Sequence, residues 1–219
     1  MPRSASRAAV RAQVDQSGRV LGPKALQTRE RLLGATDDLL SKRSLRELRV
    51  VDIARKAGTS PATFYQYFRD VEDAVLLLAE QADDEMPALV EQLEAAWSGA
   101  DRLERARGVV DGFIRHWDSH RAILRVRNLA AEEGDRRFRR TRRKALGPVL
   151  EGLAGQIESF QRQGKVGSEI HPQAAAAALA AFLERLASYH SELEGLGIAR
   201  EDLVDTCARI LVQTVTGEA

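Results

Sequence analysis

The chain has 219 residues, enough to bury a sizeable core as one large or two small domains. Its sequence has no apolar run near the roughly 18 residues of a membrane helix, and its single cysteine excludes an internal disulfide framework. The formal net charge is only +1, yet the part up to Asp70 holds 14 Lys and Arg against 7 Asp and Glu. A basic first third on an acidic body is the charge distribution of a DNA-binding head on a regulatory domain.

The first 23 residues are basic and lack aromatic side chains. Several arginines are set against one acid, Asp15, so the segment cannot bury much apolar surface. We therefore expect residues 1–23 to be a disordered basic arm in the free protein. The arm is either a contact for the DNA minor groove or a leader without a role. It has no apolar stretch of the kind found in secretory signals, which favours a cytoplasmic location.

A helix-turn-helix is indicated by the stretch VDIARKAGTSPATFYQYFRDVEDA, residues 51–74. Gly58 can adopt a positive φ and end the first helix. Ser60 is a good N-cap, and Pro61 suits the first helical position because its missing N–H costs nothing there. The second helix is predicted from Pro61 to Tyr67. Two helices joined by a short turn containing Gly place a recognition helix in the major groove of DNA.

The region from Arg49 to Ala74 resembles the DNA-binding domain of the TetR family of transcriptional repressors. The resemblance is carried by three motifs: D-I-A-x-x-A-G at Asp52 to Gly58, T-F-Y at Thr63 to Tyr65, and Y-F-x-D-x-E-D-A at Tyr67 to Ala74. It covers roughly Lys24 to Ala79 and implies a three-helix DNA-binding head over residues 24–70. The alternative is a helical hairpin that has no contact with DNA.

The resemblance also implies which residues touch DNA. Thr63 would face base edges, while Tyr65, Tyr67 and Arg49 would hold phosphates. Val71 stands where the family usually has a phosphate-contacting Lys, so Arg69 is expected to take over that contact. Pro61 also departs from the family, which usually has a small basic or polar residue there. The full expected set is Arg49, Thr59, Ser60, Ala62, Thr63, Tyr65, Gln66, Tyr67 and Arg69.

The whole chain is predicted to be all-α, with about nine helices. Three belong to the head, beginning with a helix from Lys24 to Leu40. Six belong to a regulatory body over residues 71–219, where helical periodicity is broken by Gly and Pro. The body helices are expected at Asp70 to Trp97 (interrupted or kinked at Pro87), Arg102 to Asp118, Arg121 to Glu132, Asp135 to Gln163, Pro172 to Leu196 and Arg200 to Thr216.

The body shows no enzyme motif: it lacks a nucleophile motif, a Gly-rich phosphate loop and paired catalytic carboxylates in context. We expect no enzymatic activity, no cofactor and no metal. His116 and His120 lie four apart on a predicted helix and could share a metal, but no third ligand is evident and ordinary polar surface is favoured. Cys207 is interpreted as a small buried hydrophobe in preference to a redox sensor. His171 and His190 stand alone and are interpreted as structural.

Apolar side chains recur at helical spacing through the body, and core packing explains any one of them. The segment W-D-S-H-R-A that begins at Trp117 resembles the regulatory domain of a TetR subgroup that includes the ethionamide-related repressor. In that subgroup the positions of Phe113 and Trp117 line a tunnel for an elongated apolar ligand, although several of its tunnel aromatics are missing here. The implied ligand site comprises Phe113, Trp117, Leu124, Leu150, Phe182, Leu186 and Tyr189.

A second basic run, RRFRRTRRK, occupies residues 136–144. A solvated helix face, partly neutralised by nearby acids, is the favoured interpretation. The alternatives are an anionic headgroup site at a cavity mouth, since Arg forks suit phosphate, or an extra contact to the DNA backbone.

The last two predicted helices suggest a homodimer through residues 172–216. Clustered alanines let backbones approach closely, and the final helix has an apolar stripe of Leu203, Val204, Ile210, Leu211 and Val215. In the family these two helices pair with their mates as a four-helix bundle.

The combined hypothesis is a cytoplasmic, homodimeric repressor that binds double-stranded operator DNA and is released by a small lipophilic effector. A palindromic operator is expected, because its symmetry mirrors the two-fold symmetry of a dimer. No association of this protein with a membrane is expected. The rival hypotheses are a TetR-like activator or architectural DNA binder without an effector, and an enzyme on a helical body.

Overall fold

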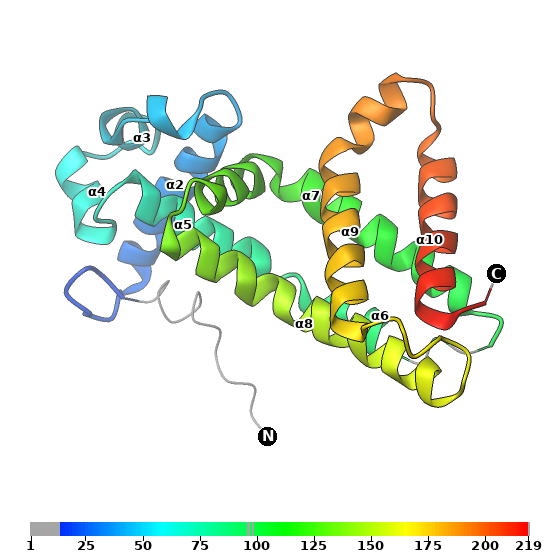
Figure 1. Ribbon diagram of the computed structural model, residues 1–219. Helices are drawn as coiled ribbons and strands as arrows, with labels where there is room; N and C mark the ends of the chain where they lie inside the picture. The colour runs from blue at the N-terminus through cyan, green and yellow to red at the C-terminus, as the bar shows by residue number, and fades with distance from the viewer. Residues whose placement is uncertain (1–13, 96, 98, 219) are drawn as a thin grey trace. The chain divides into compact units, whose positions relative to one another are not determined.

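The computed structural model describes residues 14–95, 97 and 99–218, and over these residues the chain is helical (Figure 1). The prediction of an all-α fold is confirmed, because the only strand-like pairing in the described part is an isolated bridge between Val14 and Val20. The helices are α2 (Pro23–Leu40), α3 (Val50–Lys56), α4 (Pro61–Tyr67), α5 (Val71–Asp83), α6 (Pro87–Glu94), α7 (Arg102–Glu132), α8 (Arg136–Arg162), α9 (Pro172–Gly195) and α10 (Arg200–Thr216), with a 3₁₀ turn η1 (Leu45–Glu47).

The chain divides into two compact units. The head unit comprises residues up to Asp84 together with His120–Arg142, and the body unit comprises Glu85–Ser119 together with the residues from Arg143 onward. The sequence expectation ended the head at Asp70. The observed head is larger because α5 packs its buried side chains against α2, and because the C-terminal part of α7 and the start of α8 supply Ile123, Val126 and Phe138 to the same core.

The head core is built from the inner faces of α2 to α5. Leu32, Leu33 and Leu40 of α2 are buried at helical spacing, and Thr36 among them bonds its hydroxyl to the carbonyl of Leu32 at 2.8 Å. A buried ion pair between Arg127 of α7 and Asp83 of α5 adds a charged link inside this unit. Removing either partner of this ion pair would leave an uncompensated buried charge, which would strongly destabilise the folded unit.

Part of the predicted basic arm has defined structure. Asp15 accepts hydrogen bonds from the backbone N–H groups of Ser17 and Arg19, which closes a tight turn. The Gln16 side chain donates to the carbonyl of Tyr67 at 2.8 Å and to a carboxylate oxygen of Asp73 at 3.2 Å. The expectation of disorder therefore does not hold from Val14 onward, because polar contacts to α4 and α5 replace the missing apolar burial. Residues 1–13 lie outside the described residues.

Two predicted boundaries differ from the observed helices. The helix expected over Asp70 to Trp97, with an interruption or kink at Pro87, is fully divided into α5 and α6, and Pro87 is the first residue of α6, where its lack of an N–H is tolerated. Conversely, the two helices expected on either side of Ser119 form one helix, α7, with a kink where His120 has φ −125° and ψ 20°. Within residues 14–218, as far as they are described, the nine helices equal the predicted number because these two differences offset each other.

The body core is formed by α6 to α10 and contains Trp97, Val109, Ile114, Leu153 and Leu183 among its most buried side chains. Helices α9 and α10 run side by side and are joined by a short loop (Figure 1). The side chain of Gln156 on α8 donates to the carbonyls of Leu93 and Ala95, which satisfies acceptors left free at the C-terminal end of α6. Among the described residues no helix is long and apolar enough to cross a membrane.

The end of α10 depends on one glycine. Gly217 follows the helix with φ +71°, in the left-handed region, and its N–H donates to the carbonyl of Gln213 at 3.0 Å. A Cβ at this position would lie 2.0 Å from the carbonyl oxygen of Lys165, so both the backbone conformation and the packing require glycine.

We predict that Gly217→Ala lowers the free energy of unfolding by at least about 1–2 kcal/mol, because it adds left-handed strain and a clash with backbone. The control is Gly195→Ala at the end of α9, where a Cβ meets nothing within 4 Å. That variant should be unchanged or more stable by about 0.5–1 kcal/mol. Urea unfolding at one fixed protein concentration measures both, and equal stability of the two variants would contradict the assignment.

Candidate DNA-binding surface and ligand site

The helix-turn-helix is formed by α3, a tight turn and α4. Ile53 and Ala54 of α3 are fully buried, and Gly58 turns the chain with φ +64°. The N–H of Thr59 then donates to the carbonyl of Ala54 at 2.9 Å, which closes the turn. This confirms the local chemistry that the sequence predicts, a Gly that ends one helix just before the N-cap of the next.

The first turn of α4 is fixed by Ser60. Its hydroxyl oxygen accepts from the N–H of Thr63 at 3.1 Å, and the two hydroxyl oxygens are 2.9 Å apart. Thr63 is half-buried and its hydroxyl is held in place by this pair. Since a hydroxyl offers one donor and two acceptor positions, the contact orients Thr63 and leaves capacity for a further partner.

The outer side of α4 is open to solvent, whereas its inner side is packed. Ala62, Gln66 and Tyr65 are exposed, with 54% of the Tyr65 surface accessible. On the inner side the rings of Phe64 and Phe68 pack 5.2 Å apart in the head core. The inner packing thus holds α4 while its outer residues stay free to meet another molecule.

Tyr67 differs from the other expected contact residues because its side chain is only 7% exposed and belongs to the head core. Its backbone carbonyl accepts the hydrogen bond from Gln16. The expected phosphate contact of Tyr67 would have to come from the small part of the ring that is accessible.

The two expected arginines have different surroundings. Arg49 is exposed and is the residue immediately before α3. Arg69 is exposed, but its guanidinium donates to Asp73 at 2.9 Å, and this hydrogen bond raises the pKa of Arg69 above its usual value. A guanidinium has five N–H donors, so pairing with Asp73 orients Arg69 and does not exhaust it.

Asp73 and Gln16, which the sequence did not single out, support the candidate DNA-binding surface through their contacts. Asp73 is 1% exposed and collects hydrogen bonds from Gln16 and from both the backbone and side chain of Arg69. Its own N–H is capped by Asp70 at 2.6 Å. These contacts hold the link between α4 and α5. A pocket of about 270 Å³ beside them is lined by Val14, Asp15, Gln16, Arg29, Tyr67, Arg69 and Asp73.

Five of the seven expected ligand-site residues belong to the body core. Phe113 and Leu186 are buried there, and Trp117, Leu150 and Phe182 are partly buried against it. Leu124 is buried but belongs to the head unit. Tyr189 lies at the surface, where its ring packs against the guanidinium of Arg185 at 3.8 Å and its hydroxyl accepts from that group.

The cavities described in the body unit are lined by other residues, several of them charged. The larger, of about 620 Å³, is lined by Arg107, Asp111, Arg200, Glu201, Asp202, Val204 and Asp205. In its wall Arg107 pairs with Asp205, and Arg200 pairs with Asp111 at 3.2 Å. Hydrogen bonds from Arg209 and then from Arg107 hold the pKa of the Asp205 carboxyl below its usual value. This charged wall is unlike the apolar tunnel that the sequence predicts.

The remaining chemical candidates have structural environments. Cys207 is buried, and burial raises the pKa of its thiol, which disfavours the reactive thiolate. His190 is buried, with one ring nitrogen 2.8 Å from the carbonyl of Ala187 and the other 3.2 Å from Asp118. Both environments agree with the structural interpretations made from the sequence.

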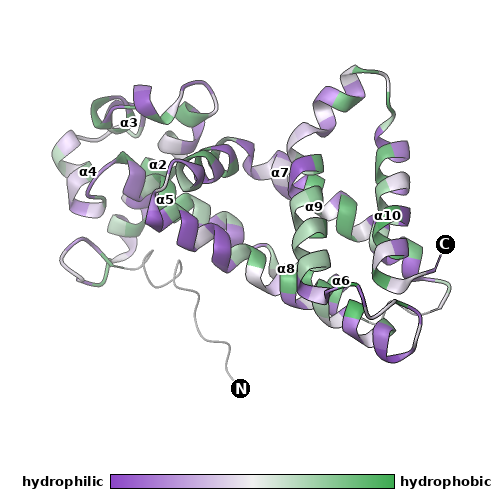
Figure 2. Ribbon diagram, in the orientation of Figure 1, coloured by the Kyte–Doolittle hydropathy of each residue, from purple (hydrophilic) through white to green (hydrophobic). Residues whose placement is uncertain are grey.

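The basic run of residues 136–144 forms the start of α8, which is hydrophilic in Figure 2. Phe138 and Thr141 are buried, while Arg136, Arg139 and Arg140 are exposed. Arg137 is held by Asp135 at 2.9 Å. The run is thus an amphipathic helix whose cations line the outer side, as the favoured solvated-face interpretation requires.

These features define a helix-turn-helix DNA-binding regulator with an all-helical body. Comparison with known families agrees: residues 32–76 match the bacterial regulatory proteins of the tetR family, and residues 88–219 match the tetracyclin repressor-like C-terminal domain. The chain belongs to the TetR family. Members of this family are transcriptional regulators and not enzymes.

The chain is similar along nearly its whole length to the HTH-type transcriptional regulator EthR of Mycobacterium tuberculosis, with 25% identity over 213 residues, 96% of this chain and 97% of EthR. A TetR-family transcriptional regulator from Streptomyces coelicolor has a similar structure, with a TM-score of 0.66 and 18% identity over 89% of this chain and 82% of that one. So does FadR from Bacillus subtilis in complex with stearoyl-CoA, with a TM-score of 0.62 and 17% identity over 87% and 99%. At these identities the structural likeness shows the shared fold.

Proposed function

We propose that this TetR-family regulator is a homodimeric repressor that reads operator DNA with α4 and leaves it when a small lipophilic effector binds the body. The observation that carries the DNA part is the contrast between the two sides of α4. Phe64 is fully buried on one side, and Tyr65 and Gln66 are exposed on the other. A protein with this function acts in the cytoplasm, where bacterial DNA lies.

In this proposal Thr63 contacts base edges from the first turn of α4, and Tyr65 and Arg49 hold phosphates on either side. Thr59, Ser60, Ala62 and Gln66 complete the contact surface, and Arg69 contributes a further phosphate contact. The two recognition helices of a dimer would enter successive major grooves about 34–36 Å apart, or wider if the operator geometry demands it.

We predict different effects of Thr63→Val and Arg49→Ala on binding to duplexes that the parent protein selects from a random library. Thr63→Val should relax sequence preference. If a base hydrogen bond is lost, the binding free energy for the preferred duplex should weaken by about 1–3 kcal/mol. Arg49→Ala should weaken all duplexes alike and reduce the slope of log K against log salt by about one. Fluorescence anisotropy over a salt series measures both effects.

The control is Arg162→Ala, which removes the same charge from an exposed residue at the end of α8. It should leave affinity, preference and salt slope close to those of the parent. If Thr63→Val and Arg49→Ala bind the selected duplexes as the parent does at every salt concentration, the contact assignment is wrong.

A dimer through α9 and α10 is supported by the side chains that these helices leave exposed. Ala174, Ala177, Ala178 and Ala181 form an exposed row of small residues along α9. Ile210 of α10 is 42% exposed. By contrast Leu203, Leu211 and Val215, part of the stripe that the sequence suggested for the interface, are buried in the core of the single chain.

We predict that Ala178→Arg and Ile210→Arg each dissociate the dimer, because each places an unpaired charge in an apolar interface. Light scattering should give about twice the 24.2 kDa chain mass for the parent and the single chain mass for the variants at micromolar concentration. Gln163→Arg, at an exposed residue after α8, is the control and should remain dimeric. A monomeric parent would refute the proposal. Leu211→Arg is a poor test, because Leu211 is 0% exposed and its replacement would unfold the body.

The proposal of a lipophilic effector is supported by the apolar side chains that the body gathers and by two of the comparisons. The hydrophobic core of the body includes Phe113, Trp117, Leu150, Phe182 and Leu186. EthR is similar along almost the whole chain, and FadR, similar in fold, is in complex with a long-chain acyl-CoA. A long apolar chain is therefore the ligand chemistry we propose. The alternative is a TetR-like activator or architectural DNA binder without an effector.

We predict that palmitic acid, stearic acid or stearoyl-CoA raises the melting temperature of the full-length protein and releases its selected DNA. At about 100 times Kd, mass action stabilises the folded state by about 2.7 kcal/mol, which corresponds to about 5–10 °C for a chain of this size. Trp117→Ala should abolish the response and leave DNA binding intact. Tyr189→Ala removes an exposed aromatic ring and should keep the response. No shift and no release across the acyl series would leave the effector-free DNA binder as the better hypothesis.

A further inference from the structure

The start of α8 presents a row of exposed arginines. Arg136, Arg139 and Arg140 are exposed, and none of the three forms an ion pair with any residue that the structure describes. Residues three and four positions apart lie on the same side of a helix, so the three side chains form one row. The row belongs to the head unit, which also contains α2 to α5.

The opposite side of α8 holds this row in place within the head unit. Phe138 is fully buried in the head core, and the 3.6-residue period of the helix directs Arg136 and Arg140 away from it. Asp135, just before α8, accepts from the backbone N–H of Arg137 at 2.8 Å and pairs with its guanidinium at 2.9 Å. The nearest acid before the helix is thus engaged by Arg137 and leaves the exposed row uncompensated.

The row is unfavourable for the protein on its own. Like charges three and four positions apart on a helix repel one another, and cations in a first turn oppose the helix dipole. Among the described helices, the first turn of α8 holds no acid, whereas those of α5 and α10 hold two each. A local rule broken without compensation inside the chain is expected where a functional partner supplies the compensation. For a row of guanidinium groups, that partner must be anionic.

The start of α8 also lies beside the end of the helix-turn-helix in the same unit. The guanidinium of Arg137 is 3.8 Å from the carboxylate of Asp70, the N-cap residue of α5. Arg137 and Arg69 are close enough for their charges to repel, and Arg69 follows the last residue of α4 by two positions. Figure 2 shows the hydrophilic start of α8 beside α5. The arginine row therefore continues the cationic surface that begins with Arg69.

We propose that the start of α8 is an additional DNA-binding surface, in which Arg136 and Arg140 contact phosphates of the duplex that α4 reads. This inference rests on the proposed DNA-binding function and adds to it a surface outside the helix-turn-helix. The planar donor set of a guanidinium matches the geometry of a phosphate. Contacts to phosphate raise affinity and orient the protein but carry no sequence information. The row should therefore strengthen binding to every duplex alike.

The test is the salt dependence of DNA binding by the full-length double variant Arg136→Ala/Arg140→Ala. The probes are duplexes that the parent protein selects, each extended by about one helical turn on either side. Losing one phosphate contact lowers the slope of log K against log salt by about one, so the double variant should lose about two for each protomer bound. Its preference among duplex sequences should equal that of the parent. Arg136→Lys/Arg140→Lys keeps both charges and should keep most of the slope.

The matched control is Arg121→Ala/Arg125→Ala, which removes two exposed arginines, also four positions apart, from α7 in the same unit. It should keep the slope of the parent. The Arg136→Ala/Arg140→Ala variant should be at least as stable as the parent to heat, because it removes charges that repel each other. The proposal is overturned if that variant keeps the parent's slope, or if the control loses as much slope as it does.

Two comparisons separate this surface from the other proposals. If Arg49→Ala lowers the slope and Arg136→Ala/Arg140→Ala does not, the α8 surface is wrong and the proposed function stands. If the parent selects no duplex at all, both are wrong. If Arg136→Ala/Arg140→Ala binds DNA as the parent does but loses the melting-temperature response to stearoyl-CoA, the row holds an anionic headgroup, and the proposal is overturned in favour of that role.

Discussion

The DNA-binding surface depends on how a seven-residue helix is held, because a helix of this length does not persist alone in water. Three interactions hold α4: the Ser60 cap at its start, the burial of Phe64 within it, and the contacts of Asp73 just beyond its end. Asp73 is decisive, since one buried carboxylate joins the link between α4 and α5 to the segment around Gln16. A buried carboxylate is costly unless it is paired and hydrogen-bonded, so these partners form a set that must be present together.

The helix-turn-helix could be predicted from the sequence because its signals are local. Gly58, Ser60 and Pro61 act within a few residues, and each occupies the position in the turn that its chemistry predicts. Boundaries that depend on packing were less predictable. The chain around Ser119 has no local reason to continue as a helix, yet α7 runs through it with a kink at His120. The ordered segment at Val14 to Val20 could not be anticipated either, because the partners of Gln16 lie more than 50 residues away.

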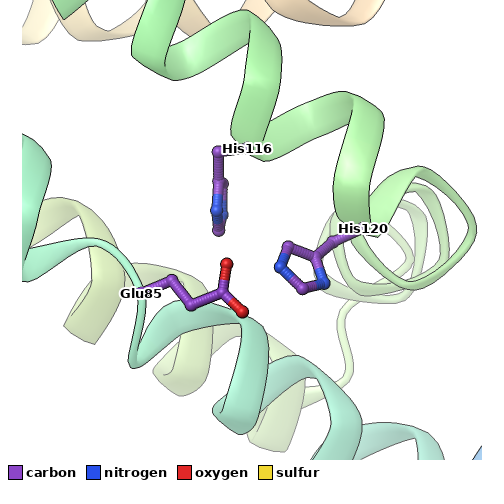
Figure 3. Close-up of side chains that lie close together, drawn as sticks. All are labelled: Glu85, His116 and His120. Carbon is purple, nitrogen blue, oxygen red and sulfur yellow. The ribbon is translucent and has the colours of Figure 1, made fainter.

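The candidate sites show the same contrast between features set by local sequence and features set by packing. Exposure on the outer side of α4 follows from helical periodicity once Phe64 and Phe68 are assigned to the core. Periodicity cannot tell the core of one chain from an interface between two, which is why Leu211 of α10 is buried within the monomer while its neighbour Ile210 is exposed. The proximity of Glu85 to His116 within the body unit (Figure 3) could not be predicted from the sequence for a similar reason. Glu85 and His116 are 31 positions apart, and their proximity depends on how closely α6 packs on α7 at Gly112.

A signal from the body to the DNA surface has few covalent routes. The chain passes between the two units at Asp84–Glu85, at Ser119–His120 within α7 and at Arg142–Arg143 within α8. A ligand can shift the DNA-binding equilibrium only by the difference in its affinity for two conformations, so it must act on groups whose arrangement differs between them. At the second of these passages the backbone of His120 departs from helical geometry. A lipophilic effector near Trp117, one turn before His120, would act on the same stretch of helix. By thermodynamic linkage the effector and the DNA would then each change the affinity of the protein for the other by the same factor.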